Sequence, residues 1–182
     1  MRRSEVEATA AVPKADFIRA MRMVASSVAV VTTDGSAGRH GATVSAFSSV
    51  SADPPTVLVC LRAESRISQA VAANRRLCVN VLSHDREDIA NRFAGKDDDR
   101  LADRFSGIEV YGCPGTPPEI DGATIFQADV DQIVTSGSHH IFICKVMTVR
   151  EGLKKPLTYM DGSYHHVIPQ NASSTSLLAR SA

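Results

Sequence analysis

Short runs of β-branched and aliphatic residues recur along this chain without regular helical segments between them. Parallel strands need crossover connections of a dozen or more residues, usually a helix, so a parallel sheet would show strands and helices in alternation. That alternation is missing here. The pattern therefore predicts a mainly β fold with short helices, in which the strands form an antiparallel barrel. The strongest runs are Val28–Thr33, Thr56–Leu61, Leu77–Leu82 and Ile141–Val146.

Turn residues mark the places where the predicted strands reverse. Asp161-Gly162 lies between 157–160 and 163–167, and an Asp-Gly pair flanked by β segments is typical of a two-residue hairpin. Asp53-Pro54-Pro55 interrupts another β-rich stretch, because proline cannot donate to a strand ladder. We therefore expect one strand over 42–50 and the next over 56–61.

Helices are predicted at four places. Phe17, Ala20, Met21 and Val24 are spaced i, i+3, i+4 and i+7, so they form one apolar stripe on a helix over 14–27. Three shorter helices are expected over 68–73, over 85–93 and in a segment that ends at Phe105.

Length and charge limit the class of protein. The 182 residues are enough for one domain with a core, and we expect a flexible arm over 1–13, the domain over 14–168 and a disordered tail over 169–182. The 20 basic and 20 acidic residues cancel, so neither nucleic acid nor an anionic membrane is a predicted partner. No run of about 18 apolar residues predicts a membrane span, and the N-terminal residues lack an apolar signal core. We expect a cytoplasmic protein.

Several common signatures of catalytic and metal sites are missing. The four cysteines are widely spaced and form no C-x-x-C pair, which predicts no metal site. Three of them lie in apolar β-like runs and are expected to be core thiols in a reducing compartment. The sequence contains no G-x-G-x-x-G, no phosphate-binding G-x-x-x-x-G-K-[ST], no G-x-S-x-G and no H-E-x-x-H. The adjacent histidines of each His-His pair would point to opposite faces of a strand, so a pair cannot hold one metal ion without other ligands.

The stretch from Gly41 to Leu61 combines hydroxyl residues with an apolar strand. It has two interpretations from its residues alone. The hydroxyls are tolerated on a partly exposed edge strand, or they form with backbone N–H groups a cradle for an anionic ligand. The hydroxyl residues are Thr43, Ser45, Ser48, Ser49 and Ser51.

Motifs in the right order along the chain make it similar to the flavin reductase-like family of FMN-binding split barrels. The resemblance covers residues 15–167 and implies an antiparallel split β-barrel that binds FMN, with FAD as an alternative. The motifs that carry it are Gly41–Ser51 with Pro54-Pro55 and Val57–Leu61, then Val79–Ser83, Arg92–Lys96, Gly137–Ile143, Pro156-Leu157 with Tyr159, and Gly162 with Tyr164.

The resemblance also implies which residues contact the ligands. Thr43, Ser45, Ser49 and Ser51 would lie at the flavin, with the backbone of Val44 and Ala46 at the edge of its ring system. Arg62 and Ser65 would hold the ribityl phosphate, and Lys96 would lie near the flavin or its phosphate. His139 and Tyr164 would lie near the flavin and the incoming nicotinamide.

Judged without the family, these side chains have simpler interpretations. His139 would be a surface or hydrogen-bonded histidine, and Lys96, beside three aspartates, a solvated charge. Arg62 and Arg66 would be surface charges. Two positions also depart from the family pattern, because Ser138 replaces an acid and Ser163 replaces a basic residue. These changes leave FMN binding in place and leave the choice between NADH and NADPH open.

The implied activity is an NAD(P)H-dependent flavin reductase, a homodimer that transfers a hydride from nicotinamide to FMN or FAD and supplies reduced flavin to a partner monooxygenase. No residue is expected to act as a nucleophile or an obligatory acid, because the cofactors carry the chemistry. Two alternatives stay open: a reductase that holds FMN and reduces a second substrate such as a cobalt corrin, and a non-catalytic FMN-binding protein, which Ser138 and Ser163 favour.

Overall fold

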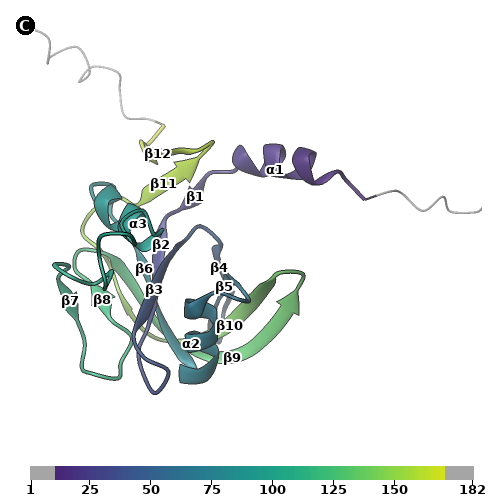
Figure 1. Ribbon diagram of the computed structural model, residues 1–182. Helices are drawn as coiled ribbons and strands as arrows, with labels where there is room; N and C mark the ends of the chain where they lie inside the picture. The colour runs from purple at the N-terminus through teal and green to yellow at the C-terminus, as the bar shows by residue number, and fades with distance from the viewer. Residues whose placement is uncertain (1–10, 171–182) are drawn as a thin grey trace, which may run out of the picture.

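A seven-stranded antiparallel sheet forms the body of the computed structural model, which describes residues 11–170 (Figure 1). The strands follow the order β3-β2-β6-β9-β10-β5-β4 across this sheet. The predicted arm over 1–13 and tail over 169–182 lie mostly outside the described residues. The strands of the large sheet are β2 (Ala29–Thr33), β3 (His40–Val44), β4 (Phe47–Ala52), β5 (Pro55–Arg62), β6 (Arg76–Val81), β9 (Thr124–Ser136) and β10 (His139–Arg150).

The two edge strands of this sheet are consecutive in the chain. β3 and β4 lie at opposite edges, yet only Ser45 and Ala46 separate them. Three peptide steps span at most about 11 Å, so the sheet must curl until its edges nearly meet. The Ala46 carbonyl accepts a hydrogen bond from the Cys60 N–H at 3.0 Å, which ties the connection to β5. The predicted antiparallel split barrel is confirmed, with the split between β3 and β4.

The single strand predicted over 42–50 is wrong. Val44 pairs with Ala29 on β2, whereas Phe47 pairs with Val59 on β5. Because β2 and β5 are four strands apart in the sheet, one straight strand cannot reach both. The chain leaves the first ladder at Ser45 and enters the second at Phe47. Alternation of residue types does not reveal such a change of partner.

The barrel has a core on each side of its central strands. Val31 and Val79 point into the barrel, where they pack with the side chains of β5, β9, β10 and α2 (Arg66–Asn74). Val30 and Cys78, one residue earlier on each strand, point outward and pack under α3 (Glu87–Phe93). β2 and β6 are therefore buried on both faces, which explains why their sequences are continuous apolar runs.

A small second sheet joins the two ends of the described chain. It has the order β1-β11-β12, from β1 (Ser26–Ser27), β11 (Leu157–Met160) and β12 (Ser163–His166). Asp161 and Gly162 connect β11 to β12 with φ angles of 46° and 81°. A two-residue turn with positive φ at both positions matches the twist of a hairpin, so the Asp-Gly prediction is confirmed. A separate pair is formed by β7 (Val110–Tyr111) and β8 (Glu119–Ile120).

Two helix predictions need correction. The first helix, α1 (Lys14–Arg22), ends five residues before the predicted boundary because Ser26 and Ser27 pair with β11 instead. The segment before Phe105 is a series of turns and not a helix, since Asp103 accepts the Phe105 N–H and Arg104 bonds to carbonyl groups elsewhere. Within residues 11–170, no helix has the length and apolar character to span a bilayer.

A buried amide holds the long loop before β9 against the barrel. Asn80 on β6 donates from Nδ2 to the Val30 carbonyl at 3.0 Å and accepts the Ile120 N–H at Oδ1 at 2.7 Å. Thr32 adds a bond from its hydroxyl to the Pro118 carbonyl at 2.5 Å. Both polar side chains are fully buried, so these bonds replace water that cannot enter.

Replacement Asn80→Ala should lower the free energy of unfolding by about 2–3 kcal/mol, because it leaves the buried Ile120 N–H without its acceptor. Urea denaturation followed by circular dichroism measures the change. Gln132→Ala, at an exposed amide, is the control and should stay within about 0.5 kcal/mol of the starting protein. An Asn80→Ala protein as stable as this control would contradict the structural role of the amide.

Candidate functional site

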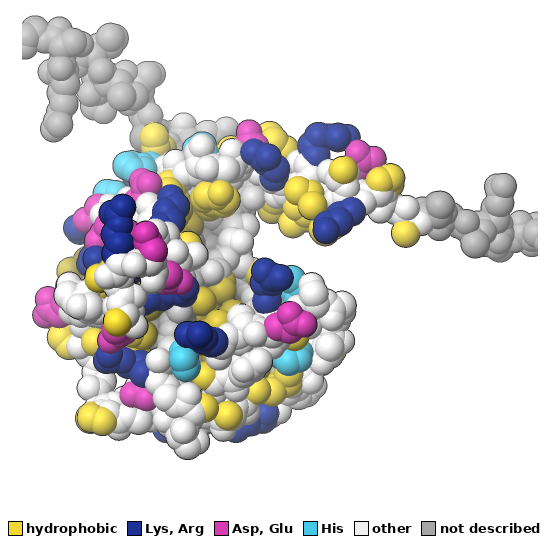
Figure 2. Space-filling model, in the orientation of Figure 1, with side chains coloured by type: hydrophobic (Ala, Val, Ile, Leu, Met, Phe, Trp, Pro, Cys, Tyr) yellow, Lys and Arg dark blue, Asp and Glu magenta, His cyan; other side chains and the backbone are white. Residues whose placement is uncertain are grey.

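A deep groove opens between the part of the molecule that carries α3 and the part that carries α2 and the β9–β10 hairpin (Figure 2). A cavity of about 890 Å³ lies between β3, the start of α2 and the segment 98–105. A second cavity of about 550 Å³ lies under α1 and includes Ser45 and the β11–β12 turn. Ligand pockets typically have volumes of about 300–1,000 Å³, so both are large enough for a small molecule.

The predicted hydroxyl residues lie along the split between β3 and β4, but not all of their hydroxyls are available. Thr43 donates to the Ala90 carbonyl on α3 at 2.7 Å. Ser51 donates to the Asp53 carbonyl at 2.9 Å and accepts the Asp53 N–H, which closes the turn to β5. Ser45 and Ser49 are exposed. The stretch therefore contributes both to the fold and to the exposed surface beside the split.

Three predicted phosphate and nicotinamide contacts come together beside the start of α2. The register of β10 on β5 places His139 opposite Arg62, and the Ala63 N–H donates to the Ser138 carbonyl at 3.0 Å. Ser65 follows at once and caps α2, accepting the Ser68 N–H at 3.3 Å. The positive end of a helix dipole thus lies next to an exposed arginine, an arrangement that suits an anion.

Lys96 and Tyr164 are brought together through one residue of α3. The Tyr164 hydroxyl donates to Asn91 Oδ1 at 3.0 Å, and the Lys96 N–H donates to the Asn91 carbonyl at 3.2 Å. Burial, followed by the charge of Glu87, raises the pKa of Tyr164, so its phenol stays neutral at physiological pH. The hairpin residue Tyr164 is therefore tied to the turn that carries Lys96.

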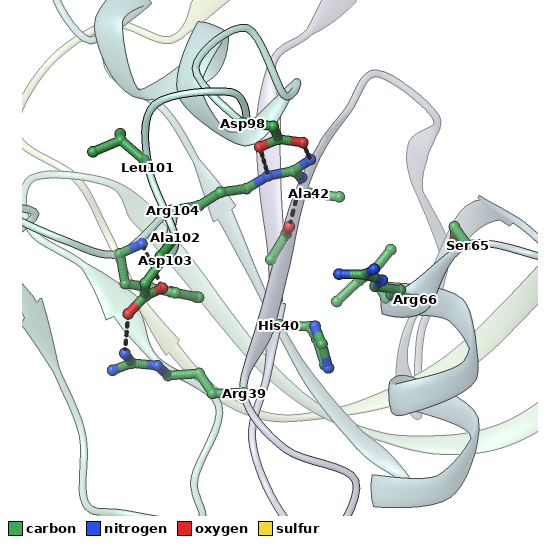
Figure 3. Close-up of a pocket in the computed structure, with 13 residues that line it drawn as sticks. Arg39, His40, Ala42, Ser65, Arg66, Asp98, Leu101, Ala102, Asp103 and Arg104 are labelled. Carbon is green, nitrogen blue, oxygen red and sulfur yellow. Dashed lines mark hydrogen bonds and ion pairs between the residues drawn. The ribbon is translucent and has the colours of Figure 1, made fainter.

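Arg104 fixes the wall of the larger cavity and was not predicted as a site residue. Its guanidinium binds both oxygens of Asp98 and donates to the carbonyls of Phe93 at 2.9 Å and Gly41 at 3.2 Å (Figure 3). The hydrogen bonds from Arg104 lower the pKa of Asp98, and those to Asp98 raise the pKa of Arg104. Both groups are charged at neutral pH. Because Arg104 reaches a strand 63 residues away, no local pattern in the sequence signals this contact.

Arg39 forms a second tether of the same wall. Its guanidinium donates to Asp103 Oδ2 at 2.6 Å and lies over the ring of Phe105, 4.6 Å from the centroid. Phe105 packs edge-on against Phe93 of α3. An arginine stacked on a buried ring and paired with a carboxylate has little freedom to move. Arg39 was not predicted as a site residue either, because it follows a turn and belongs to none of the motifs.

Three arginines and two aspartates line the larger cavity. Arg39 pairs with Asp103 and Arg104 pairs with Asp98, whereas Arg66 has no ion pair among residues 11–170. It is the first residue of α2 and borders the cavity beside Ser65 (Figure 3). Three arginines against two aspartates leave this cavity positive, and the start of α2 adds to that potential. The donor set fits a phosphate-bearing ligand. Arg66 is exposed, which agrees with its simpler interpretation as a surface charge, and it also lines this cavity.

Thiol chemistry has little support at this site. Burial raises the pKa of the Cys144 thiol to about 12 and raises that of Cys78 well above its usual range. Both thiols point away from solvent and stay protonated at neutral pH. No group of three His, Cys, Asp or Glu side chains that could hold a metal occurs in the part of the chain that the structure describes.

Comparisons with known proteins agree with this arrangement. Residues 21–167 match the profile of the "Flavin reductase like domain". The FMN reductase (NADH) RutF of Serratia proteamaculans is 38% identical over 161 residues, which are 87% of this chain and 91% of that protein. The crystal structure of a putative flavin reductase from Haemophilus somnus superposes with a TM-score of 0.79 at 34% identity, covering 86% of this chain and all of that one.

A further solved structure is nitrilotriacetate monooxygenase component B from Mycobacterium thermoresistibile. It has a TM-score of 0.79 and 27% identity, and the match covers 88% of this chain and 89% of that chain. The chain described here belongs to the flavin reductase-like family. The resemblance found from sequence motifs is thereby confirmed.

Proposed function

We propose that this protein is an NADH-dependent flavin reductase that transfers a hydride from NADH to FMN. The observation that carries the proposal is the meeting of Arg62, Ser65 and His139 beside the start of α2, where Ser65 lines a cavity of about 890 Å³. The names of relatives at 37–38% identity, FMN reductase (NADH), support the same pair of ligands. NADH is therefore favoured over the NADPH that the sequence left open.

The residues fit the phosphate of FMN. Arg62 is exposed and offers a planar fork of N–H donors, and α2 presents the positive end of its dipole at Ser65. Lys96 is exposed in the turn after α3 and would add a cation if it reaches the ligand. Ser45, Ser49 and the backbone of Val44 and Ala46 line the split where the ring system would lie, and Thr43 and Ser51 shape that surface through the bonds described above.

The flavin, when bound, supplies the atom that accepts the hydride. The protein's own residues need only bind the two partners, orient them and exclude water from the contact. His139 projects from the first position of β10 beside Arg62, where it would contact the nicotinamide side. The Tyr164 hydroxyl already donates to Asn91, so it is not free to bind a ligand directly. Tyr164 would instead help to position Asn91 and the turn that carries Lys96. No group is required as nucleophile.

Reduced flavin would then pass to a partner monooxygenase. This step rests on the name of the relative described as a monooxygenase component. The domain boundaries 14–168 remain a prediction that agrees with the extent of the family match, and the cytoplasmic location also remains a prediction.

Purified protein with NADH and FMN should oxidise NADH well above the rate of free flavin, measured as loss of the nicotinamide absorbance. The reaction should slow strongly when riboflavin replaces FMN at low concentration, because the phosphate contacts are lost. Binding of FMN without NADH or NADPH oxidation would overturn the reductase proposal and support the non-catalytic alternative. If added cytochrome c fails to accept electrons from the reduced flavin, the protein retains that flavin. This result would instead favour the alternative in which the protein reduces a second substrate.

Replacement Arg62→Ala should weaken FMN binding by about tenfold and leave riboflavin binding unchanged, because Arg62 would contact only the phosphate. Flavin fluorescence titration measures both constants. Arg100→Ala, at an exposed arginine paired only with its neighbour Asp99, is the matched control and should bind FMN normally. Equal losses for FMN and riboflavin would show that Arg62 does not bind the phosphate.

We also propose that the protein is a homodimer. The single chain leaves apolar side chains uncovered on the outside of the β9–β10 hairpin and on β4, where Met147 is 65% exposed and Val50, Val134 and Val149 are each about half exposed. The apolar face of α1, which projects from the body in Figure 1, is exposed too. A second copy of the same chain would cover such a surface with its own apolar residues.

Light scattering after gel filtration should give about twice the mass of one chain. The double substitution Met147→Glu with Val149→Glu should shift the protein toward the monomer, because the dimer would have to bury these charges in its interface. Thr148→Glu, at the exposed residue between them, tests for a general effect of added charge and should stay dimeric. A monomeric parent protein at micromolar concentration would contradict the proposal.

A further inference from the structure

We propose that His140 is a positioning residue: through Ser68 it holds the start of α2 in place and so sets the affinity of the protein for the phosphate of the flavin. This inference rests on the proposed function, which places that phosphate beside Ser65. His140 follows His139 on β10, and successive side chains of a strand point to opposite faces. His139 is exposed at the end of the strand, whereas His140 is half-buried and turns toward α2.

A chain of hydrogen bonds joins His140 to the residue at the end of β5. His140 Nδ1 lies 3.1 Å from the hydroxyl oxygen of Ser68. The Ser68 N–H donates to the Ser65 hydroxyl oxygen at 3.3 Å, and the Ser65 hydroxyl donates to the Arg62 carbonyl at 2.7 Å. Because His140 pairs with Leu61 in the ladder of β10 on β5, these bonds close a loop through both strands and the first turn of α2. A shift of that turn would stretch a bond in this loop.

The other contacts of α2 constrain its first turn less. Ile67 and Val71 pack in the barrel core, and apolar packing is not directional. Asn74 bonds to β2 and to the turn before β3, but it lies at the other end of the helix. Among the residues that the structure describes, the bond between Ser68 and His140 is the side-chain hydrogen bond that joins the first turn of α2 to β10.

Burial keeps this bond in place. The Ser68 hydroxyl is fully buried, and a buried hydroxyl that loses its partner is destabilising. The first N–H groups of a helix have no acceptor within the helix, and they face an anion bound at its start. Their direction depends on the turn that Ser68 fixes. A displaced turn would therefore weaken the bonds to a phosphate, since hydrogen bonds depend on distance and angle, and would leave the contacts of the flavin ring system unchanged.

Replacement Ser68→Ala is the first test, and it carries little risk to folding because alanine is a strong helix former. We expect the dissociation constant for FMN to rise about tenfold and that for riboflavin, which lacks the phosphate, to stay within about twofold. Flavin fluorescence titration measures both constants without NADH. Gln69→Ala, at the exposed next residue of α2, is the matched control and should bind both flavins as the parent does.

Replacements of His140 test the other side of the bond. His140→Phe keeps a ring and removes Nδ1, so it should match Ser68→Ala. His140→Asn, whose side-chain amide can still bond to Ser68, should restore most of the affinity for FMN. Because Ser68→Ala and His140→Phe remove the same bond, the ratio of the FMN and riboflavin constants in the double variant should equal that in either single variant.

The outcomes separate this inference from the proposed function. A ratio equal to that of the parent in both single variants, or equal losses for the two flavins, overturns the inference alone. The same holds if His140→Asn binds FMN no better than His140→Phe. A parent protein that does not prefer FMN to riboflavin contradicts the phosphate site and this inference with it. A parent protein that binds FMN but fails to oxidise NADH overturns the proposed function, whatever the ratios in the variants.

Discussion

The two-residue connection between β3 and β4 is the constraint on which the rest of the structure depends. Because Ser45 and Ala46 must join opposite edges of a seven-stranded sheet, the sheet has to curl, and its inner face becomes a closed core. The curl also decides where a ligand can bind. The barrel interior is filled by valine, leucine and phenylalanine side chains, so the available space lies outside it, along the split and beside α2.

The two walls of the groove are built on different physical principles. One wall consists of α2 and the paired ends of β5 and β10, where backbone hydrogen bonds fix Arg62, Ser65 and His139 relative to one another. The other wall, residues 98–105, has no regular secondary structure and depends on side chains. Arg104 tethers this wall to β3 and α3, and Arg39, just before β3, holds Asp103 and Phe105. Removing one of these side chains would therefore change the cavity far more than an equal change on the first wall.

The sequence predicted what depends on local pattern and missed what depends on partners distant in the chain. Continuous apolar runs revealed β2 and β6, and Asp161-Gly162 revealed the last hairpin, because burial and turn geometry act on neighbouring residues. The change of partner at Ser45 left no trace in the alternation of residue types. Arg39 and Arg104 were missed since each finds its carboxylate and ring only after the chain has folded. The motifs placed Arg62 and His139 in one site, but the roles of both residues are still predictions.

The distribution of charge in the groove follows from the kind of chemistry that a flavin performs. A hydride moves between two cofactors without a protein acid or nucleophile, so the side chains predicted to lie near the ring system, Ser45 and Ser49, can be small and neutral. Two of the charged residues, Arg62 and Arg66, instead lie beside the start of α2, where a phosphate would fix the position of the rings. Two of the three arginines in the larger cavity are neutralised by aspartates and serve the wall. Arg66 has no ion pair among the residues that the structure describes, so it adds a positive charge beside the start of α2, where the phosphate of a ligand would be favoured.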